Sequence, residues 1–181
     1  IEGAEYIATS DTIFHWPNLP RHIVIQGGGY IALEFAHIFK GLGAEVTLLY
    51  RGDLFLRGFD HDIRQAIAEE MRKQNIKLYF FCDIEKIQKT SEGFNVVTTN
   101  NDTIACDLVL SAIGRTPNIQ NLNLGRADIQ IATNGQIAIN KDYQTSQAHI
   151  YALGDVANGF PLTPVAIAEG HVLADRLFGN K

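Results

Sequence analysis

Short apolar runs and longer amphipathic segments alternate along the first part of the chain. Three apolar runs have the length of a strand and predict buried strands: Ile23–Ile25, Val46–Leu49 and Leu78–Phe81. The broad apolar set over residues 31–42 predicts a buried helix, and apolar positions at four-residue spacing predict an amphipathic helix over residues 60–74. The order strand, helix, strand predicts a parallel βαβ arrangement.

The pattern changes after this region. Residues 84–89, 94–99 and 103–111 are strand-like runs separated by polar turn residues, and they predict an antiparallel meander. Residues 1–20 show no sustained period, and Pro17 and Pro20 favour a lead-in loop there.

A polar, loop-rich stretch that follows Gly114 predicts a domain boundary near residue 117. Beyond it, the pattern predicts short strands and then a helix, over residues 129–131, 137–139, 150–153 and 165–178. The fold class predicted is α/β: a Rossmann-like three-layer domain with an antiparallel β-meander crossover over residues 1–116, plus a partial second segment over residues 117–181.

A glycine turn lies between the first buried strand and the first helix. Gly27, Gly29 and Ala32 match the dinucleotide fingerprint G-x-G-x-x-G/A, with Tyr30 and Ile31 between the last two. The first glycine permits a tight turn, the second lets the backbone approach a diphosphate, and the small third residue permits close helix packing. The amino end of the helix then favours the diphosphate. The alternative is a tight turn that binds no ligand.

The end of the second strand indicates which dinucleotide binds. NAD-binding domains carry an acidic residue about 20 positions after the fingerprint, on the ribose 2′-hydroxyl. Here Tyr50 stands at that place, followed by Arg51 and Arg57. Arginines bind a 2′-phosphate, so the sequence predicts NADPH. The alternatives are that both arginines are ordinary solvated residues, or that Asp53 pairs with Arg51 and weakens the positive charge.

Composition narrows the function further. A formal net charge of -5 gives no broad cationic surface for nucleic acid or anionic lipid, and no apolar run approaches the length of a membrane span. Cys82 and Cys106 match neither a dithiol motif nor paired metal-ligand spacing, and they predict small buried residues in a cytoplasmic protein. The histidines show no metal-ligand pattern, so no metal site is expected.

Three further motifs follow in order: A-I-G-R-T-P-N over residues 112–118, T-S-Q-A-H-I-Y-A-L-G-D over residues 145–155, and L-T-P-V-A over residues 162–166. With the glycine turn and the arginines, they make the chain resemble the pyridine nucleotide-disulfide oxidoreductases from residue 1 to the last helix. Within that family the chain resembles the flavoprotein glutathione reductases. Trypanothione reductases, mercuric reductases and a freestanding, non-catalytic nucleotide-binding module remain alternatives.

The resemblance implies site residues. Tyr30 would cover the nicotinamide pocket, and Glu34 would face the flavin and pair with a lysine from the FAD domain. Arg115 would lie at the boundary between NADP and flavin, and Asp155 would bind the ribityl or diphosphate part of FAD. The remaining residues placed at the cofactors by the matching motifs are Gly114, Gly154, Leu162 and Thr163.

The resemblance also implies an oxidoreductase in which a hydride passes from NADPH to FAD, and reducing equivalents then pass through a redox-active disulfide to a small disulfide substrate, oxidised glutathione, as part of cell redox homeostasis. The complete enzyme would be a homodimer. The redox cysteines and the acid-base histidine have no counterpart in this chain, which starts at Ile1. We therefore expect a piece of a longer polypeptide that binds NADPH, carries no catalytic residue and has no turnover alone.

Overall fold

The computed structural model describes residues 1–157 and 161–179, which form two compact units. The first unit is Ile1–Gly114 and the second is Arg115–Lys181, so the division falls two residues before the boundary at 116/117 that the sequence suggests. Each unit is described by itself.

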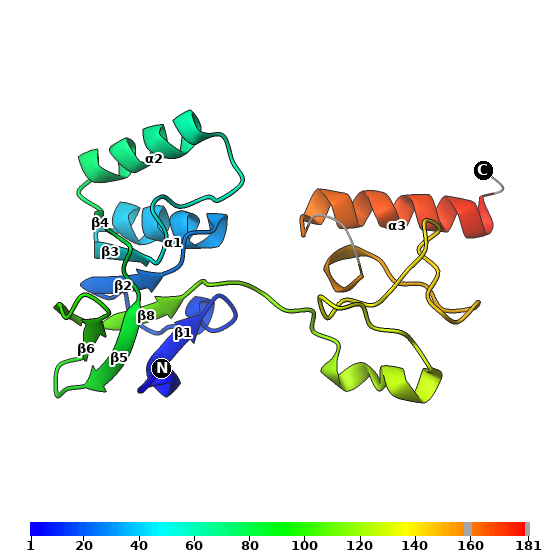
Figure 1. The fold of residues 1–181 in the computed structure, drawn as a ribbon, viewed down its shortest axis with the longest axis horizontal. Helices are drawn as coiled ribbons and strands as arrows, with labels where there is room; N and C mark the ends of the chain where they lie inside the picture. Colours follow the sequence, from blue (N-terminus) through cyan, green and yellow to red (C-terminus); the bar gives the residue numbers. More distant parts are fainter. Residues whose placement is uncertain (158–160, 180–181) are drawn as a thin grey trace. The chain divides into compact units, whose positions relative to one another are not determined.

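A five-stranded parallel sheet forms the centre of the first unit, in the order β1-β8-β2-β3-β4 (Figure 1). The strands are β1 (Ile7–Thr9), β8 (Leu108–Ser111), β2 (His22–Gln26), β3 (Glu45–Tyr50) and β4 (Lys77–Phe80). Helix α1 (Tyr30–Gly41) connects β2 to β3, and helix α2 (His61–Lys73) lies between β3 and β4. The predicted βαβ order is confirmed.

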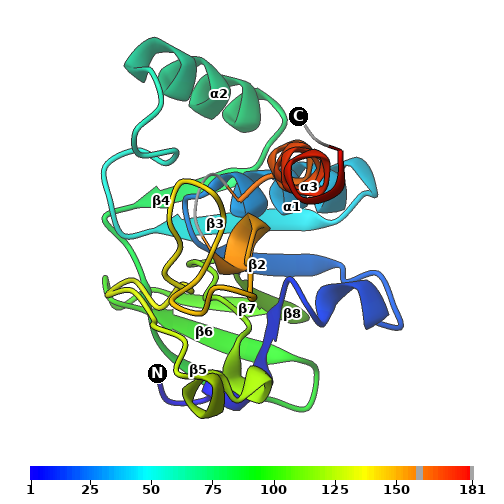
Figure 2. The ribbon, with the colours of Figure 1, turned by 90° about the vertical axis from the view of Figure 1, so that its right-hand side faces the viewer.

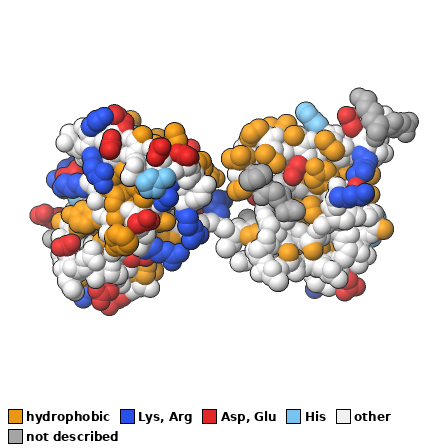
Figure 3. All heavy atoms as spheres, turned by 45° about the horizontal axis from the view of Figure 1, so that its top comes forward, with side chains coloured by type: hydrophobic (Ala, Val, Ile, Leu, Met, Phe, Trp, Pro, Cys, Tyr) orange, Lys and Arg blue, Asp and Glu red, His pale blue; other side chains and the backbone are white. Residues whose placement is uncertain are grey.

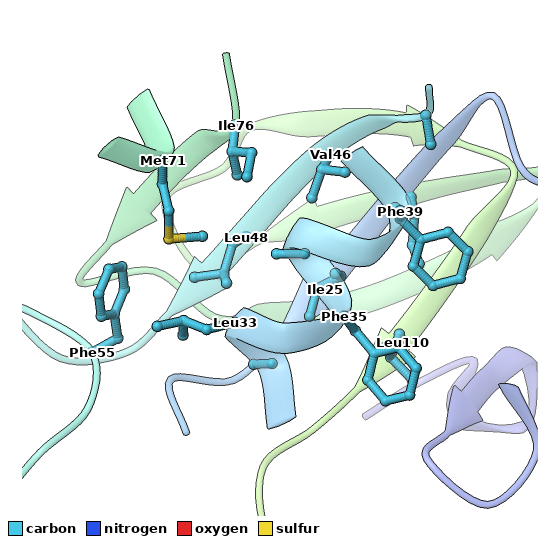
Figure 4. Close-up of a cluster of buried hydrophobic side chains, with 14 of the residues drawn as sticks. Ile25, Leu33, Phe35, Phe39, Val46, Leu48, Phe55, Met71, Ile76 and Leu110 are labelled. Carbon is cyan, nitrogen blue, oxygen red and sulfur yellow. The ribbon is translucent and has the colours of Figure 1, made fainter. Parts of the chain in front are cut away.

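Alternate residues of the strands pack on opposite faces of this sheet. Ile25 of β2, Leu48 of β3 and Leu110 of β8 belong to the cluster that α1 and α2 cover. Figure 4 shows Leu33 of α1 and Met71 of α2 directed into the same cluster. Because both faces are buried, the strands read as continuous apolar runs rather than as alternating ones.

The opposite face of the sheet is covered by a second, antiparallel sheet of β5 (Ile84–Lys89), β6 (Phe94–Thr98) and β7 (Thr103–Cys106). Val24, Leu49 and Val109 point to this side and pack with residues of the meander. Helices, parallel sheet and meander therefore form three layers, as predicted (Figure 2).

The strand predicted over residues 103–111 is wrong as a single strand, because the chain leaves β7 at Asp107 and enters the parallel sheet as β8. The Asp107 carboxylate accepts hydrogen bonds from the N–H groups of Arg21, at 2.8 Å, and His22, at 2.9 Å. The guanidinium of Arg21 lies 3.1 Å from the same carboxylate. These contacts hold the chain where it passes from one sheet to the other.

Asp107 supplies a pH-dependent part of the stability. The N–H of His22, followed by the side chain of Arg21, lowers the pKa of Asp107. Because the pKa of Asp107 is lower in the folded protein than in the unfolded chain, its stabilising effect is complete above the pKa of the unfolded chain, which is ~4. The effect is lost as the pH falls through the pKa of the folded protein. We expect Asp107→Asn to lower the free energy of unfolding at pH 7 by about 1–2 kcal/mol, since the carboxylate is only partly buried.

Urea denaturation at pH 7 and in steps below pH 4 measures this effect. The difference between wild type and the Asp107→Asn variant should narrow as the pH falls. A difference that is constant over this range would contradict the assignment of the stabilisation to the ionised carboxylate.

The lead-in loop predicted for residues 1–20 is wrong in part. Ile7–Thr9 form strand β1, which pairs in parallel with β8, Ile7 opposite Val109. A three-residue strand carries almost no periodic signal, and its pairing partner lies about a hundred residues along the chain. The remaining lead-in contains two short 3₁₀ turns.

The second unit contains α3 (Thr163–Phe178) and irregular backbone. The strands predicted over residues 129–131, 137–139 and 150–153 are wrong: only isolated bridges join Ile131 to Ile137 and Gln144 to Tyr151. The last helix begins two residues earlier than predicted, with Leu162 as its N-cap.

Helix α3 has no buried residue. Its exposed apolar side chains include Ile167, Val172 and Phe178, the last 85% exposed. Figure 3 shows apolar side chains gathered on the surface of this unit. No helix in the described ranges is long and apolar enough to cross a membrane.

Candidate functional site

The glycine turn of the first unit has the geometry that only glycine allows at its first position. Gly27 has a φ of 139°, and a Cβ there would lie 2.3 Å from the carbonyl oxygen of Ala112. The N–H of Gly27 donates to the carbonyl of Leu49 at 2.9 Å. The turn is therefore held between β8 and β3, at the carboxyl end of the parallel sheet.

Gly29 differs from Gly27. It is the N-cap of α1, with a φ of -87°, and a Cβ there would meet no atom within 4 Å. The open space is where a ligand can approach the backbone. The first N–H groups of α1 have no partner within the helix and carry the positive end of its dipole, so an anion is favoured beside Gly29 and Tyr30.

The loop after β3 is tied to this turn. The N–H of Leu56 donates to the carbonyl of Gly28 at 2.7 Å, and a Cβ on Gly28 would lie 2.4 Å from the ring of Tyr50. The same ring lies against Gly52, where a Cβ would come within 2.7 Å of it. Tyr50 thus packs between the glycine turn and the loop that carries the arginines, a role that the sequence analysis missed.

Arg64 of α2 orders the rest of this loop. Its Nε donates to the carbonyl of Phe55 at 2.7 Å, and its guanidinium also donates to the carbonyl of Leu54. The carboxylate of Asp53 lies 3.9 Å from Arg64 and accepts a hydrogen bond from the N–H of Leu54. Asp53 is therefore directed to Arg64 and not to Arg51. The signal that could have found Arg64 was weak, since an arginine on a polar helix face is usually solvated.

The glycine turn, the start of α1 and the loop after β3 all line one cavity of about 420 Å³. Both Arg51 and Arg57 line it and are exposed, and neither forms an ion pair within residues 1–157 and 161–179. The lining residues come from the ends of the strands, the glycine turn and the loop after β3: Gln26, Gly27, Gly28, Gly29, Tyr30, Leu49, Tyr50, Arg51, Leu56, Arg57, Phe59, Asp83, Ala112 and Ile113.

Three more of the predicted residues belong to α1 but do not line this cavity. Ala32 is completely buried, as close packing of the helix on the sheet requires, and Ile31 packs against the same core. Glu34 is exposed and lines an apolar groove of about 580 Å³ that also includes Tyr30 of α1 and Ile67 of α2.

The other predicted residues lie outside the cavity. Gly114 is the last residue of the first unit, and Arg115 begins the second. Within the second unit, Gly154 donates its N–H to the Glu169 carboxylate of α3 at 2.7 Å. That bond brings Gly154 and Asp155 to α3. Leu162 and Thr163 form the start of this helix.

The two cysteines are free and buried. Burial raises the pKa of Cys106 to about 12, and it also raises the pKa of Cys82. Both thiols therefore stay protonated near neutral pH, and neither has the thiolate character of a redox-active cysteine.

The fold and the cavity are those of a dinucleotide-binding α/β domain, with the glycine turn at the start of α1 and two arginines in the loop after the next strand. The sequence profile of the pyridine nucleotide-disulphide oxidoreductases matches residues 2–170. The chain belongs to this family.

Individual relatives agree with that assignment. A glutathione reductase of Burkholderia cepacia is 43% identical over 181 residues, which is 100% of this chain and 40% of that protein. The HOCl-induced flavoprotein disulfide reductase RclA of Escherichia coli superposes with a TM-score of 0.93 at 30% identity, over 100% of this chain and 42% of that one. The fold class predicted from the sequence is confirmed. The chain spans about 40% of the length of these relatives.

A third protein is an engineered water-forming NADPH oxidase whose structure contains NADPH. It is 25% identical, has a TM-score of 0.84, and covers 97% of this chain and 42% of its own. Its named substitutions remove an aspartate and introduce two arginines six positions apart.

Proposed function

We propose that this chain is the NADPH-binding portion of a flavin-dependent disulfide reductase, most like glutathione reductase. The observation that carries the proposal is the single cavity in which the glycine turn, the start of α1, Arg51 and Arg57 meet. An aspartate at the end of β3 would repel a 2′-phosphate, and Tyr50 stands there instead. The six-residue spacing of Arg51 and Arg57 matches that of the arginines introduced into the NADPH oxidase.

The residues present fit NADPH. The open space at Gly29 admits the diphosphate against the first N–H groups of α1, where no Cβ intervenes. Arg51 and Arg57 bind the 2′-phosphate, and their exposure leaves their donors available. Tyr30, 42% exposed at the start of α1, would cover the nicotinamide pocket and move aside when NADPH binds. When bound, NADPH supplies a hydride for reduction of a flavin.

We assign the second unit to the FAD-binding part of the complete protein. Asp155, Leu162 and Thr163 are exposed where η5 (Gly154–Val156) meets the start of α3, and Gly154 holds them together through Glu169. Their role is to bind FAD, Asp155 through its carboxylate. Gly114 and Arg115 would contact cofactor in the complete protein, and Glu34 would pair there with a lysine of the FAD domain.

The activity belongs to the complete protein, because this chain spans only part of its relatives. We infer that the complete protein is a cytoplasmic homodimer that reduces a small disulfide, with glutathione disulfide as the substrate favoured by the relatives. The free, buried cysteines fit a reducing compartment. Both cysteines of this chain are buried and do not form a disulfide with each other, so we infer that the chain has no disulfide reductase turnover alone.

Titration of the 181-residue chain with NADPH and with NADH tests the cofactor assignment. Tyr30, Tyr50 and Phe59 line the cavity, and quenching of protein fluorescence reports binding. We expect NADPH to bind at least about 100-fold more tightly, since the 2′-phosphate adds charged hydrogen bonds from two arginines. Equal affinities for the two nucleotides would contradict the assignment.

A further inference from the structure

Two partly buried hydrogen bonds connect the ends of β8 and β2 to Asp83, and Gln26 and Asp83 line the cavity. The Ser111 hydroxyl at the end of β8 donates to the Gln26 side-chain carbonyl at 2.9 Å. The Gln26 amide, at the end of β2, donates to Oδ1 of Asp83 at 2.6 Å. Gln26 is 3% exposed, so the two bonds fix the orientation of its amide: the carbonyl faces Ser111 and the amide nitrogen faces Asp83.

Asp83 also forms hydrogen bonds with Ile84 and Thr99. Its Oδ1 also accepts the N–H of Ile84 at 2.8 Å. Its backbone N–H donates to the hydroxyl of Thr99 at 3.0 Å, and its carbonyl accepts the N–H of Thr99 at 2.9 Å. The side chain therefore has one orientation. Oδ2 makes no hydrogen bond within the part of the chain that the structure describes, and Asp83 lines the cavity.

A carboxylate in a cavity that binds phosphates needs an explanation, because it repels them. It is stabilising only where it faces a neutral hydrogen-bond donor of the ligand. Arg51 and Arg57 fix the end of the dinucleotide that carries the 2′-phosphate, and the base of that end is adenine. Adenine presents one exocyclic amino group, a neutral donor. Ile113 and Phe59 are exposed apolar side chains of the same cavity and offer surface for a flat base.

We propose that Asp83 selects the base of the nucleotide: its Oδ2 accepts a hydrogen bond from the adenine amino group, and Gln26 and Ser111 are positioning residues that hold Oδ1. The inference rests on the proposed NADPH site and adds base recognition to it. A base with a carbonyl in place of the amino group would set two acceptors against each other and leave the carboxylate unpaired.

The test compares NADPH with its reduced hypoxanthine analogue, in which a carbonyl replaces the adenine amino group. Both nucleotides keep the 2′-phosphate, so Arg51 and Arg57 contribute equally. We expect the wild-type chain to bind NADPH about 10-fold or more tightly than the analogue, the usual effect of one hydrogen bond to a charged group. This comparison needs no variant.

Variants locate the effect. Asp83→Asn should abolish or reverse the preference for NADPH over the analogue, because Gln26 and Ile84 hold the side-chain oxygen and the amide nitrogen then faces the ligand as a donor. Gln26→Met keeps a long side chain but removes one of the two hydrogen bonds that hold Oδ1, and it should reduce the ratio of the two affinities while NADPH still binds more tightly than NADH. Glu85→Gln removes an exposed acid two residues from Asp83 that does not line the cavity, and the ratio should stay as in wild type.

The outcomes separate this inference from the proposed function. If NADPH binds more tightly than NADH but the two bases bind equally, base selection is wrong and the NADPH site stands. A loss of affinity in Asp83→Asn that is equal for both bases would also overturn the inference, because Asp83 would then contact another part of the ligand. If NADPH does not bind at all, both proposals fail.

Discussion

Replacing Arg51 and Arg57 together by alanine is expected to lower the affinity for NADPH by about 100-fold or more and to leave the affinity for NADH unchanged. Each charged hydrogen bond to a phosphate contributes about 1.5–3 kcal/mol, and exposure of the guanidinium groups places these two at the lower end. NADH has no 2′-phosphate and therefore loses nothing. Parallel fluorescence titrations of both nucleotides measure the two effects.

The matched control removes two positive charges elsewhere. Arg72 and Lys73 end α2, where Arg72 lies over the ring of Phe80 and Lys73 pairs with Glu70 at 3.6 Å, and neither lines the cavity. Their double alanine variant should keep the preference for NADPH. If it loses that preference as completely as the Arg51/Arg57 variant, then general charge rather than a specific phosphate site accounts for the selectivity.

Gly27→Ala is expected to destabilise the first unit by about 2–6 kcal/mol. Two costs add: an L-residue at a φ of 139° is strained by about 1–3 kcal/mol, and a new Cβ that forces backbone apart costs a similar amount. The clash is with the backbone carbonyl of Ala112, at 2.3 Å, which cannot rotate away as a side chain could. Since domains are stable by only about 5–15 kcal/mol, this is a large part of the total.

Gly29→Ala is the paired variant for this prediction. Its Cβ would meet nothing within 4 Å and its φ is negative, so the free energy of unfolding should change by less than about 1 kcal/mol. NADPH affinity should nevertheless fall, because the methyl group occupies the space of the diphosphate. Urea denaturation and NADPH titration of both variants separate the two roles. Equal destabilisation by both substitutions would show that the turn differs from the one described.

The sequence accounts for the glycine turn more completely than for the rest of the site. Gly27 and Gly29 could be placed because their requirements are local: a positive φ at one and an open backbone at the other. For Tyr50, the sequence indicates only that the acidic residue of NAD-binding domains is absent from this position. Its packing between Gly28 and Gly52 depends on the path of the loop, which Arg64 holds from another helix.

The hydrophobic pattern alone determined the order of the major strands and helices in the first unit and the position of the glycine turn, since the strand and helix periods and the turn geometry depend on neighbouring residues. Only the tertiary structure decided that β1 joins the sheet, that the chain changes sheets at Asp107, and that Asp83 is fixed by Gln26, which lies 57 positions away. These features arise from contacts between segments that are distant along the chain. A short strand or a polar side chain can pair with many different segments, and only the packed fold determines which pairing forms.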